Sequence, residues 1–165
     1  MTAGERVGCA SVIPDSTRSG SFDETRAAQR PRTTRGRFTI GAMPRRTIAE
    51  FRAERAKGQD ALLASDHLGL KRFLRLDAAT YEPGALDGRT KELLGLVASA
   101  VLRCNDCIDY HLEQCVKAGF TREEIVDALN VALVVGGSIV IPHARHAMLS
   151  LDELLAEKAA GALPP

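Results

Sequence analysis

The sequence predicts an all-α fold, a compact helical bundle, and three observations lead to this prediction. Apolar residues recur at helical spacing from about residue 44 to about residue 160. Signals for helix starts and ends separate these periodic segments. No segment combines the strict apolar–polar alternation of a half-buried strand with flanking turn signals. With 165 residues, 45% apolar but only 4% aromatic, the chain is expected to build one core from aliphatic side chains.

Residues 1–43 differ from the rest of the chain. This segment is rich in Ser, Thr, Arg and Gly and has no sustained apolar period. Such a segment cannot bury enough apolar surface to offset the conformational entropy lost on ordering. We therefore expect a disordered N-terminal tail over residues 1–43 and a helical domain over residues 44–160. An alternative expectation is that translation starts at Met43, which would make the upstream residues a mis-assigned extension.

In the first half of the domain, the sequence predicts two helices and a loop. Apolar residues at helical spacing predict a helix from Thr47 to Ala56. Asp66 is the expected N-cap of a second helix. The apolar positions of that helix are Leu68, Leu70, Phe73, Leu74 and Leu76. The following segment YEPGALDG, residues 81–88, has the composition of a loop.

In the middle of the domain, the sequence predicts two consecutive helices. The segment from Arg89 to Leu102 is apolar around most of its circumference, which indicates a mostly buried helix. A second helix is expected from Cys104 to Ala118. Gly119 then suits the C′ position, because glycine adopts the left-handed backbone conformation without strain.

The last part of the domain contains a specific start signal. Thr121 and Glu124 form the pattern T-x-x-E of a capping box, which predicts a helix reaching about Val135. Residues 136–137 are both glycine and are expected to end it. A final helix should begin at Ser138 or Pro142 and reach about residue 158.

The segment RCNDCIDYH carries the clearest chemical signal. It places Cys104, Cys107 and His111 in the register C-x-x-C-x-x-x-H. On a helix these three side chains fall within an arc of roughly 60°. An imidazole beside a thiol favours the thiolate, which is the nucleophilic form, and a helix N-terminus has the same effect. Two thiols at i and i+3 can also close a disulfide, so that one attacks and the other resolves.

Other interpretations of the same residues stay open at this point. Two thiolates and an imidazole are three of the four ligands that a structural zinc ion requires. Glu92, His143 or His146 could supply the fourth, which would make the protein a zinc-stabilised binding module. No second C-x-x-C is present, so we favour a redox pair without a bound metal. Cys115 is interpreted as a small buried apolar residue.

Bulk properties exclude several classes. A net charge of +1 gives no general attraction to nucleic acid or to an anionic membrane. No apolar run reaches the length of about 18 residues expected of a membrane-spanning helix. Four cysteines and no apolar secretory leader are typical of a protein in a reducing cytoplasm. No glycine-rich phosphate loop is present, so we expect no cofactor in this chain.

Three features together resemble one family. Glu92 stands twelve residues before the first Cys, the C-x-x-C-x-x-x-H motif follows, and the run AGFTREEI spans Ala118 to Ile125. This combination resembles the carboxymuconolactone decarboxylase superfamily, in its alkylhydroperoxidase D-like branch. The resemblance covers roughly residues 43–151.

The resemblance implies a fold, an assembly and a set of roles. The fold would be the helical bundle of this branch, assembled as a homo-oligomer, either a trimer or a hexamer. Cys107 would attack a hydroperoxide, Cys104 would resolve it and donate a proton, and His111 with Glu92 would relay protons. The reductant would be an external dithiol, carried by a lipoylated or a thioredoxin-like protein.

One position departs from the family pattern. Alkylhydroperoxidase D has a His immediately before the second Cys, where this chain has Asp106. A carboxylate beside a thiol opposes thiolate formation. General disulfide reduction without efficient peroxidase activity therefore remains an alternative. A lactone decarboxylase is another alternative, less favoured because the decarboxylases of the superfamily lack the Cys pair.

Overall fold

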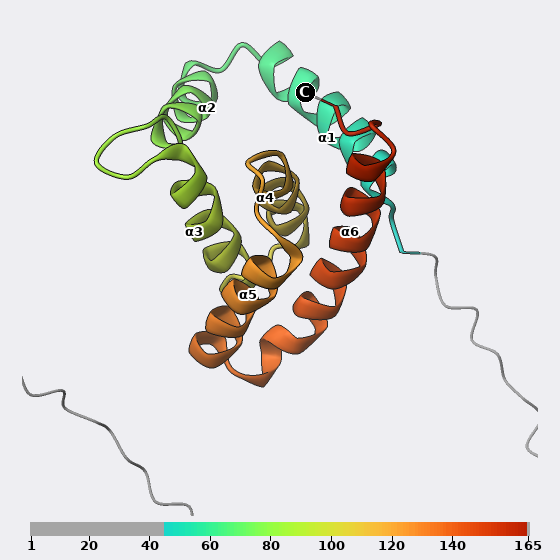
Figure 1. The fold of residues 1–165 in the computed structure, drawn as a ribbon. Helices are drawn as coiled ribbons and strands as arrows, with labels where there is room; N and C mark the ends of the chain where they lie inside the picture. Colours follow the sequence, from blue (N-terminus) through green and yellow to red (C-terminus); the bar gives the residue numbers. More distant parts are fainter. Residues whose placement is uncertain (1–44, 165) are drawn as a thin grey trace, which may run out of the picture. The chain divides into compact units, whose positions relative to one another are not determined.

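The computed structural model of the chain describes residues 45–164. Within this part the chain forms six α-helices and one 3-10 helix, with no strand (Figure 1). Their bounds are α1 Ile48–Ala64, α2 Leu68–Thr80, α3 Gly88–Val101, α4 Asn105–Lys117, α5 Arg122–Gly136, η1 Ser138–Val140 and α6 Ile141–Ala159. The predicted all-α class is confirmed for the described part. The predicted disordered tail over residues 1–43 lies outside the described residues.

Helix α4 lies at the centre of this part of the chain. It packs mainly against α3 and α6, and α3 also packs against α5 (Figure 1). Leu96 of α3, Ile108 and Leu112 of α4, and Leu151 and Leu154 of α6 are fully buried. Burial of each such side chain contributes about 1.5–3 kcal/mol relative to its exposure to water. The aliphatic core therefore fixes the position of α4, which carries the C-x-x-C-x-x-x-H motif.

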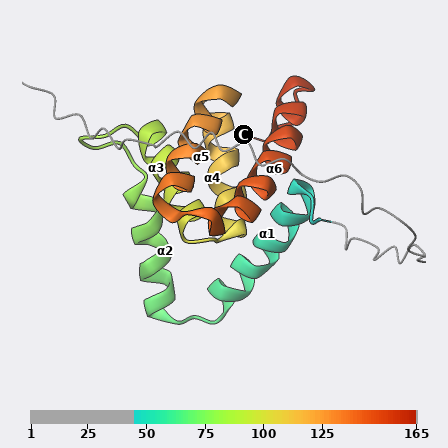
Figure 2. The same ribbon diagram turned by 90° about the horizontal axis from the view of Figure 1, so that it is seen from below.

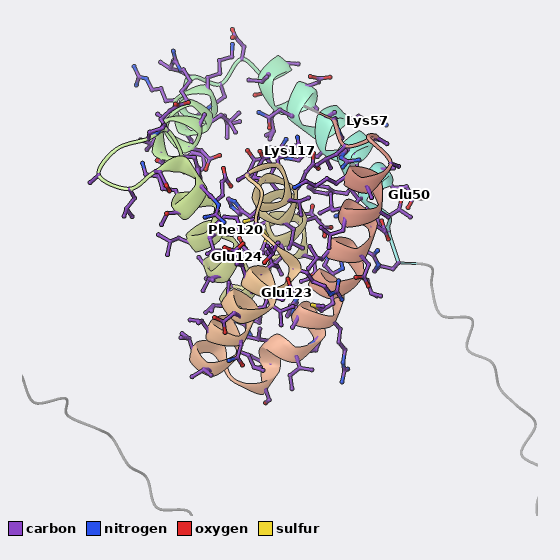
Figure 3. The ribbon with its side chains drawn as sticks, in the orientation of Figure 1. Glu50, Lys57, Lys117, Phe120, Glu123 and Glu124 are labelled. Atoms are coloured by element: carbon purple, nitrogen blue, oxygen red, sulfur yellow. A yellow bond between two sulfur atoms is a disulfide. The ribbon has the colours of Figure 1, made fainter. Side chains whose placement is uncertain are left out.

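The turn between α4 and α5 follows the prediction closely. Gly119 has a φ of 83°, and the amide of Phe120 donates to the carbonyl of Cys115 at 3.1 Å, which closes a Schellman motif. Arg89 of α3 lies 3.6 Å from the Phe120 ring centroid and donates to Glu124 at 3.0 Å. Figure 3 labels Phe120 and Glu124 at this junction. The turn is thus held against α3 as well as by its own backbone.

Capping boxes begin two of the helices. The predicted box at α5 is confirmed, because the Thr121 hydroxyl accepts from the Glu124 amide and the Glu124 carboxylate accepts from the Thr121 amide. Thr47 and Glu50 form the same arrangement at the start of α1. Helix α1 continues past its predicted end at Ala56 to Ala64. Most of the added residues are good helix formers despite Gly58 and Asp60, and they lie mainly exposed, so they show no apolar period that could have predicted them.

The predicted cap of α2 was wrong. Asp66 has a φ of 54°, in the left-handed region, whereas an N-cap residue has an extended backbone. His67 takes the N-cap position, and its Nδ1 accepts from the amide of Leu70 at 3.4 Å. The Asp66 carboxylate instead pairs with Lys71. The tight turn between α1 and α2 therefore shifts the cap by one residue.

The double glycine ends α5 as predicted. Gly137 has a φ of 75°, which glycine adopts without strain. A Cβ atom at Gly136 would lie 2.5 Å from Val140 Cγ2, so glycine also permits a close approach of the following segment. The chain then continues from Ser138 through η1 into α6, with Pro142 in the first turn.

Helices α1 and α2 lie on the outside of the helices that surround α4. They diverge from their short connecting turn, as Figure 2 shows. No residue of α2 is buried, although the helix carries several large apolar side chains. Leu68, Phe73 and Leu76 are 53%, 67% and 65% exposed. Despite these apolar side chains, no helix within residues 45–164 has the length and apolar character needed to cross a membrane.

Candidate active site

A tight turn between α3 and α4 presents the first cysteine. Arg103 has a φ of 64°, and its amide donates to the carbonyl of Ala100 at 3.1 Å. The amide of Cys104 donates to the carbonyl of Ser99, also at 3.1 Å. These two bonds form a Schellman motif with arginine in the left-handed position. Cys104 therefore ends this motif and is at the same time the N-cap of α4.

The two cysteines of the motif are joined. Cys104 and Cys107 form a disulfide, with their Cα atoms 5.3 Å apart. The Cys104 sulfur also accepts from the amide of Cys107 at 3.3 Å. Both sulfur atoms thus lie at the N-terminus of α4, where the helix dipole favours negative charge. Reduction of this disulfide would produce thiols in a setting that favours the thiolate.

His111 is fixed on one side by a carboxylate. Glu92 Oε2 of α3 lies 2.8 Å from His111 Nδ1, and both side chains are largely buried. A carboxylate accepts hydrogen bonds, so in the neutral ring the proton is on Nδ1 and Nε2 keeps its lone pair. A Cβ atom at Gly95 would lie 2.6 Å from His111 Cε1. Glycine at this position therefore makes room for the ring.

Tyr81, at the C-cap of α2, completes the surroundings of the ring. Its hydroxyl lies 3.3 Å from His111 Nε2, and the two ring centroids are 5.1 Å apart. Burial raises the pKa of Tyr81, and the negative charge of Glu92 adds to this effect. The hydroxyl therefore stays protonated and donates to Nε2. No pattern in the sequence indicated Tyr81, which lies thirty residues from His111 and outside the motif.

A cavity of about 450 Å³ gives access to the site. Cys107 and His111 of α4 line it together with side chains of α1. Phe51 and Leu62 contribute apolar surface, and Arg55 lies 4.4 Å from the centroid of the Tyr110 ring in the same wall. The cavity is large enough for a small organic molecule and combines apolar and charged walls.

Asp106, the departure from the family pattern, is paired with a cation. The guanidinium of Arg46 donates to the Asp106 carboxylate and, at 2.9 Å, to Glu54. It also lies 3.6 Å from the second oxygen of Asp109. Arg46 and Asp106 both line the cavity that contains Cys107. A positive charge from outside the motif thus offsets the carboxylate beside the thiol, which the sequence alone did not indicate.

The opposite side of α4 carries a buried polar group. Asp109 Oδ1 accepts from His146 Nε2 at 2.8 Å and from the Ser150 hydroxyl at 2.6 Å, both on α6. Asp109 Oδ2 is buried without a hydrogen bond. His143 Nδ1 also lies 2.7 Å from Asn105 Oδ1. Two histidines of α6 therefore hold the first two turns of α4.

These contacts bear on the zinc interpretation. The three proposed fourth ligands have protein partners: Glu92 contacts His111, His143 contacts Asn105, and His146 contacts Asp109. Within residues 45–164 no group of three or more His, Cys, Asp or Glu side chains is arranged to hold a metal ion. The described side chains thus do not assemble the donor set that a structural zinc site needs.

Cys115 is separate from the site, as predicted. It is fully buried in the core. Burial, with a smaller contribution from the charge of Glu92, raises the pKa of its thiol to about 12. Cys115 is therefore an unreactive apolar residue, while the predicted Cys104, Cys107, His111 and Glu92 lie in one site.

Comparison with known proteins identifies a family. The model of the carboxymuconolactone decarboxylase family matches residues 69–150. A crystal structure of a carboxymuconolactone decarboxylase family protein from Thermotoga maritima is 52% identical, covers 68% of this chain and 96% of its own, and superposes with a TM-score of 0.65. The residues matched by the family model include Glu92 of α3 and the C-x-x-C-x-x-x-H motif at α4, but not α1.

Two curated relatives extend this comparison. "Uncharacterized protein 4 in cox locus" of Paracoccus denitrificans is 35% identical over 82 residues, which are 50% of this chain and 74% of that protein. The alkyl hydroperoxide reductase AhpD of Coxiella burnetii is 34% identical over 73 residues. That match covers 44% of this chain but only 40% of the Coxiella protein.

Proposed function

Because the chain belongs to the carboxymuconolactone decarboxylase family, in its alkylhydroperoxidase D-like branch, we propose that it is a thiol-dependent peroxidase. Its redox pair is Cys104 and Cys107, and its substrate is a hydroperoxide. The observation that carries the proposal is the disulfide between these residues at the start of α4, beside a His–Glu pair. The Thermotoga relative is described as "possibly involved in antioxidative response", which supports this activity.

The roles of the two cysteines follow from access to the cavity. Cys107 lines the cavity together with His111, and it stands one helical turn before His111 on α4. Cys104 is the N-cap residue, and its sulfur lies against the amide of Cys107. We therefore assign Cys107 as the attacking thiol and Cys104 as the resolving thiol.

The reaction proceeds in three steps. First, His111 Nε2 takes the proton of the Cys107 thiol, with Glu92 stabilising the charged ring. The thiolate attacks the distal oxygen of the hydroperoxide, and the O–O bond breaks. Cys107 becomes a sulfenic acid, and the alkoxide takes the proton from His111 and leaves as an alcohol. Second, Cys104 attacks this sulfur and releases water, which forms the disulfide. Third, an external dithiol reduces the disulfide by exchange.

The size and walls of the cavity indicate the kind of hydroperoxide. Phe51 and Leu62 offer apolar surface near Cys107, which suits an organic hydroperoxide with an apolar group. The reductant is a dithiol on a lipoylated or thioredoxin-like protein, and the protein acts in the cytoplasm. This chain itself needs no cofactor for these steps.

Asp106 favours a second candidate function. A carboxylate next to Cys107 disfavours the thiolate unless Arg46 compensates for it fully. With partial compensation, the pair would exchange with disulfides of other proteins more effectively than it would reduce peroxides. The peroxide rate constant of the reduced protein, compared with its rate of insulin disulfide reduction, separates these two functions.

The exposed α2 supports a homo-oligomer, a trimer or a hexamer. A helix of 13 residues is marginal in water without tertiary packing, and α2 buries none of its residues within this chain. Leu68, Phe73 and Leu76 therefore need a partner surface, and a second copy of the chain supplies one. Light scattering of the purified protein measures the number of copies.

Peroxide treatment of the reduced protein tests the proposed function. Wild type should form the Cys104–Cys107 disulfide, visible by mass spectrometry of the digested protein. With Cys104→Ser, a sulfenic acid should be trapped at Cys107, whereas Cys107→Ser should leave Cys104 unmodified. Cys115→Ser is the matched control and should behave like wild type. Cysteines that stay unmodified in wild type would refute the proposal.

A further inference from the structure

His111 can accept only one hydrogen bond in the site as it stands. Glu92 accepts from Nδ1 at 2.8 Å, so in the neutral ring Nε2 holds the remaining lone pair. The Tyr81 hydroxyl, 3.3 Å away, donates to this lone pair. Both ring nitrogens therefore have partners while Cys104 and Cys107 are joined.

Reduction introduces a competitor for the same lone pair. In the disulfide, Cys107 has no hydrogen to donate. After reduction the Cys107 thiol is a donor. It stands four residues before His111 in α4, so the two side chains lie on the same face of the helix. Since Nε2 accepts one donor, the Cys107 thiol and the Tyr81 hydroxyl exclude each other there.

We propose that Tyr81 is a redox-dependent partner of His111, which occupies Nε2 in the disulfide form and gives way to Cys107 in the reduced form. The inference rests on the proposed function, because it takes His111 as the base for Cys107. Tyr81 acts through His111 and is therefore a positioning residue. Its hydrogen bond stabilises the oxidised protein selectively and so helps to set the redox equilibrium of the pair.

The position of Tyr81 in the fold permits this exchange. It is the C-cap residue of α2, a helix with no buried residue, and the loop that leads to α3 follows it. A rotation of the Tyr81 side chain that releases Nε2 therefore disturbs no buried residue of α2 within this chain, and Lys91 holds the backbone on both sides of Tyr81 in place. The raised pKa of Tyr81 keeps its hydroxyl a donor rather than a phenolate.

The chain provides a matched control in Tyr110. Its ring lies edge-on to the His111 ring, with centroids 5.1 Å apart, and Arg55 lies over its face. Within the described residues the Tyr110 hydroxyl makes no hydrogen bond. Tyr110→Phe thus removes a hydroxyl from the same surroundings without removing a partner of His111.

The test is a redox titration of the Cys104–Cys107 pair in buffers of reduced and oxidised dithiothreitol. A hydrogen bond of ordinary strength predicts that Tyr81→Phe shifts the equilibrium constant toward the reduced form by about three- to tenfold. At 29.6 mV for each tenfold change, this is a rise in reduction potential of about 15–30 mV. Tyr110→Phe should titrate like wild type.

Thermal unfolding in both redox states supplies the second readout. If Tyr81 stabilises only the disulfide form, Tyr81→Phe lowers the melting temperature of the oxidised protein and leaves that of the reduced protein unchanged. Equal losses in both states would assign Tyr81 a purely structural role and overturn the inference.

The remaining outcomes are also decisive. A wild-type potential for Tyr81→Phe, or the same shift in Tyr110→Phe, contradicts the inference but leaves the proposed function intact. A wild-type pair that dithiothreitol cannot reduce contradicts the proposed function, and the inference fails with it. No peroxide is used in these measurements, so peroxidase activity does not affect them.

Discussion

Asp106 and Asp109 lie one turn apart on α4, yet 68% of the Asp106 side chain is exposed and only 1% of the Asp109 side chain. Asp106 belongs to the cavity face of the helix, which also carries Cys107 and His111. Asp109 belongs to the core face, where His146 and Ser150 satisfy one of its oxygens. One helix therefore presents similar residues in two different settings.

The difference shows how a small helical protein holds reactive groups in place. The core face fixes α4 by aliphatic packing and by buried hydrogen bonds to α6. The cavity face leaves Cys107 and its neighbours open to small molecules. Changes on the core face should therefore affect stability, and changes on the cavity face should affect chemistry.

The largest expected contrast is between the thiols of the two faces. With a pKa of about 12, Cys115 has a thiolate fraction on the order of 10⁻⁴ at pH 8. After reduction of the folded protein, iodoacetamide should modify Cys107 at least about a thousandfold faster than Cys115. Peptide mass spectrometry over time measures both rates. The contrast should vanish in denaturant, and comparable rates in the folded protein would contradict it.

The charge of Glu92 should matter nearly as much. Glu92→Gln keeps an acceptor near His111 Nδ1 but removes the negative charge that stabilises the protonated ring. Hydroperoxide reduction should fall about a hundredfold, with little change in the free energy of unfolding. Glu82→Gln, at an exposed position beside the neighbouring cavity, is the control and should keep full activity. Unchanged kinetics of Glu92→Gln would remove Glu92 from the relay.

On the core face the loss should be one of stability. Asp109→Ala leaves His146 and Ser150 without their buried acceptor and should lower the free energy of unfolding by about 3 kcal/mol. Asp106→Ala breaks an exposed ion pair and should lower it by less than about 1 kcal/mol. Urea denaturation of both variants compares them directly, and equal losses would show that the two faces do not differ.

The smallest predicted effect concerns space for the His111 ring. Gly95→Ala places a methyl group where the ring lies, so we expect activity to fall about tenfold through displacement of His111. The free energy of unfolding should change little, because alanine favours a helix over glycine by about 1 kcal/mol, which offsets the cost of displacing the ring. Gly84→Ala, which lies outside the cavity and whose new methyl group makes only an ordinary contact at 3.6 Å with Lys91 Nζ, should keep wild-type activity.

Local signals in the sequence predicted most of the helices, and the Cys–His spacing predicted that Cys107 and His111 share one face of a helix. The capping box at Thr121 and the glycine at position 119 act over a few residues, so the sequence displays them directly. Asp66 misled because the backbone of the preceding turn, rather than side-chain chemistry, decides which residue caps α2.

The parts that the sequence did not predict come from tertiary contacts. Arg46 reaches Asp106 across 60 positions, and Tyr81 reaches His111 across 30. Neither residue belongs to a motif, and each gains its role only from the packing of α1 and α2 near α4. The pairing of Asp109 with His146 likewise depends on how α6 packs against α4.

The most direct test of the central claim, that the cavity face of α4 carries a cycling dithiol, is a steady-state measurement of stoichiometry. Cumene hydroperoxide and dihydrolipoamide would be followed together in the presence of the full-length protein. We expect one dithiol to be oxidised for each hydroperoxide consumed. Cys104→Ser and Cys107→Ser should abolish turnover, and Cys115→Ser should retain it. Turnover that survives the loss of Cys107, or dithiol oxidation that does not depend on hydroperoxide, would contradict a cycling dithiol.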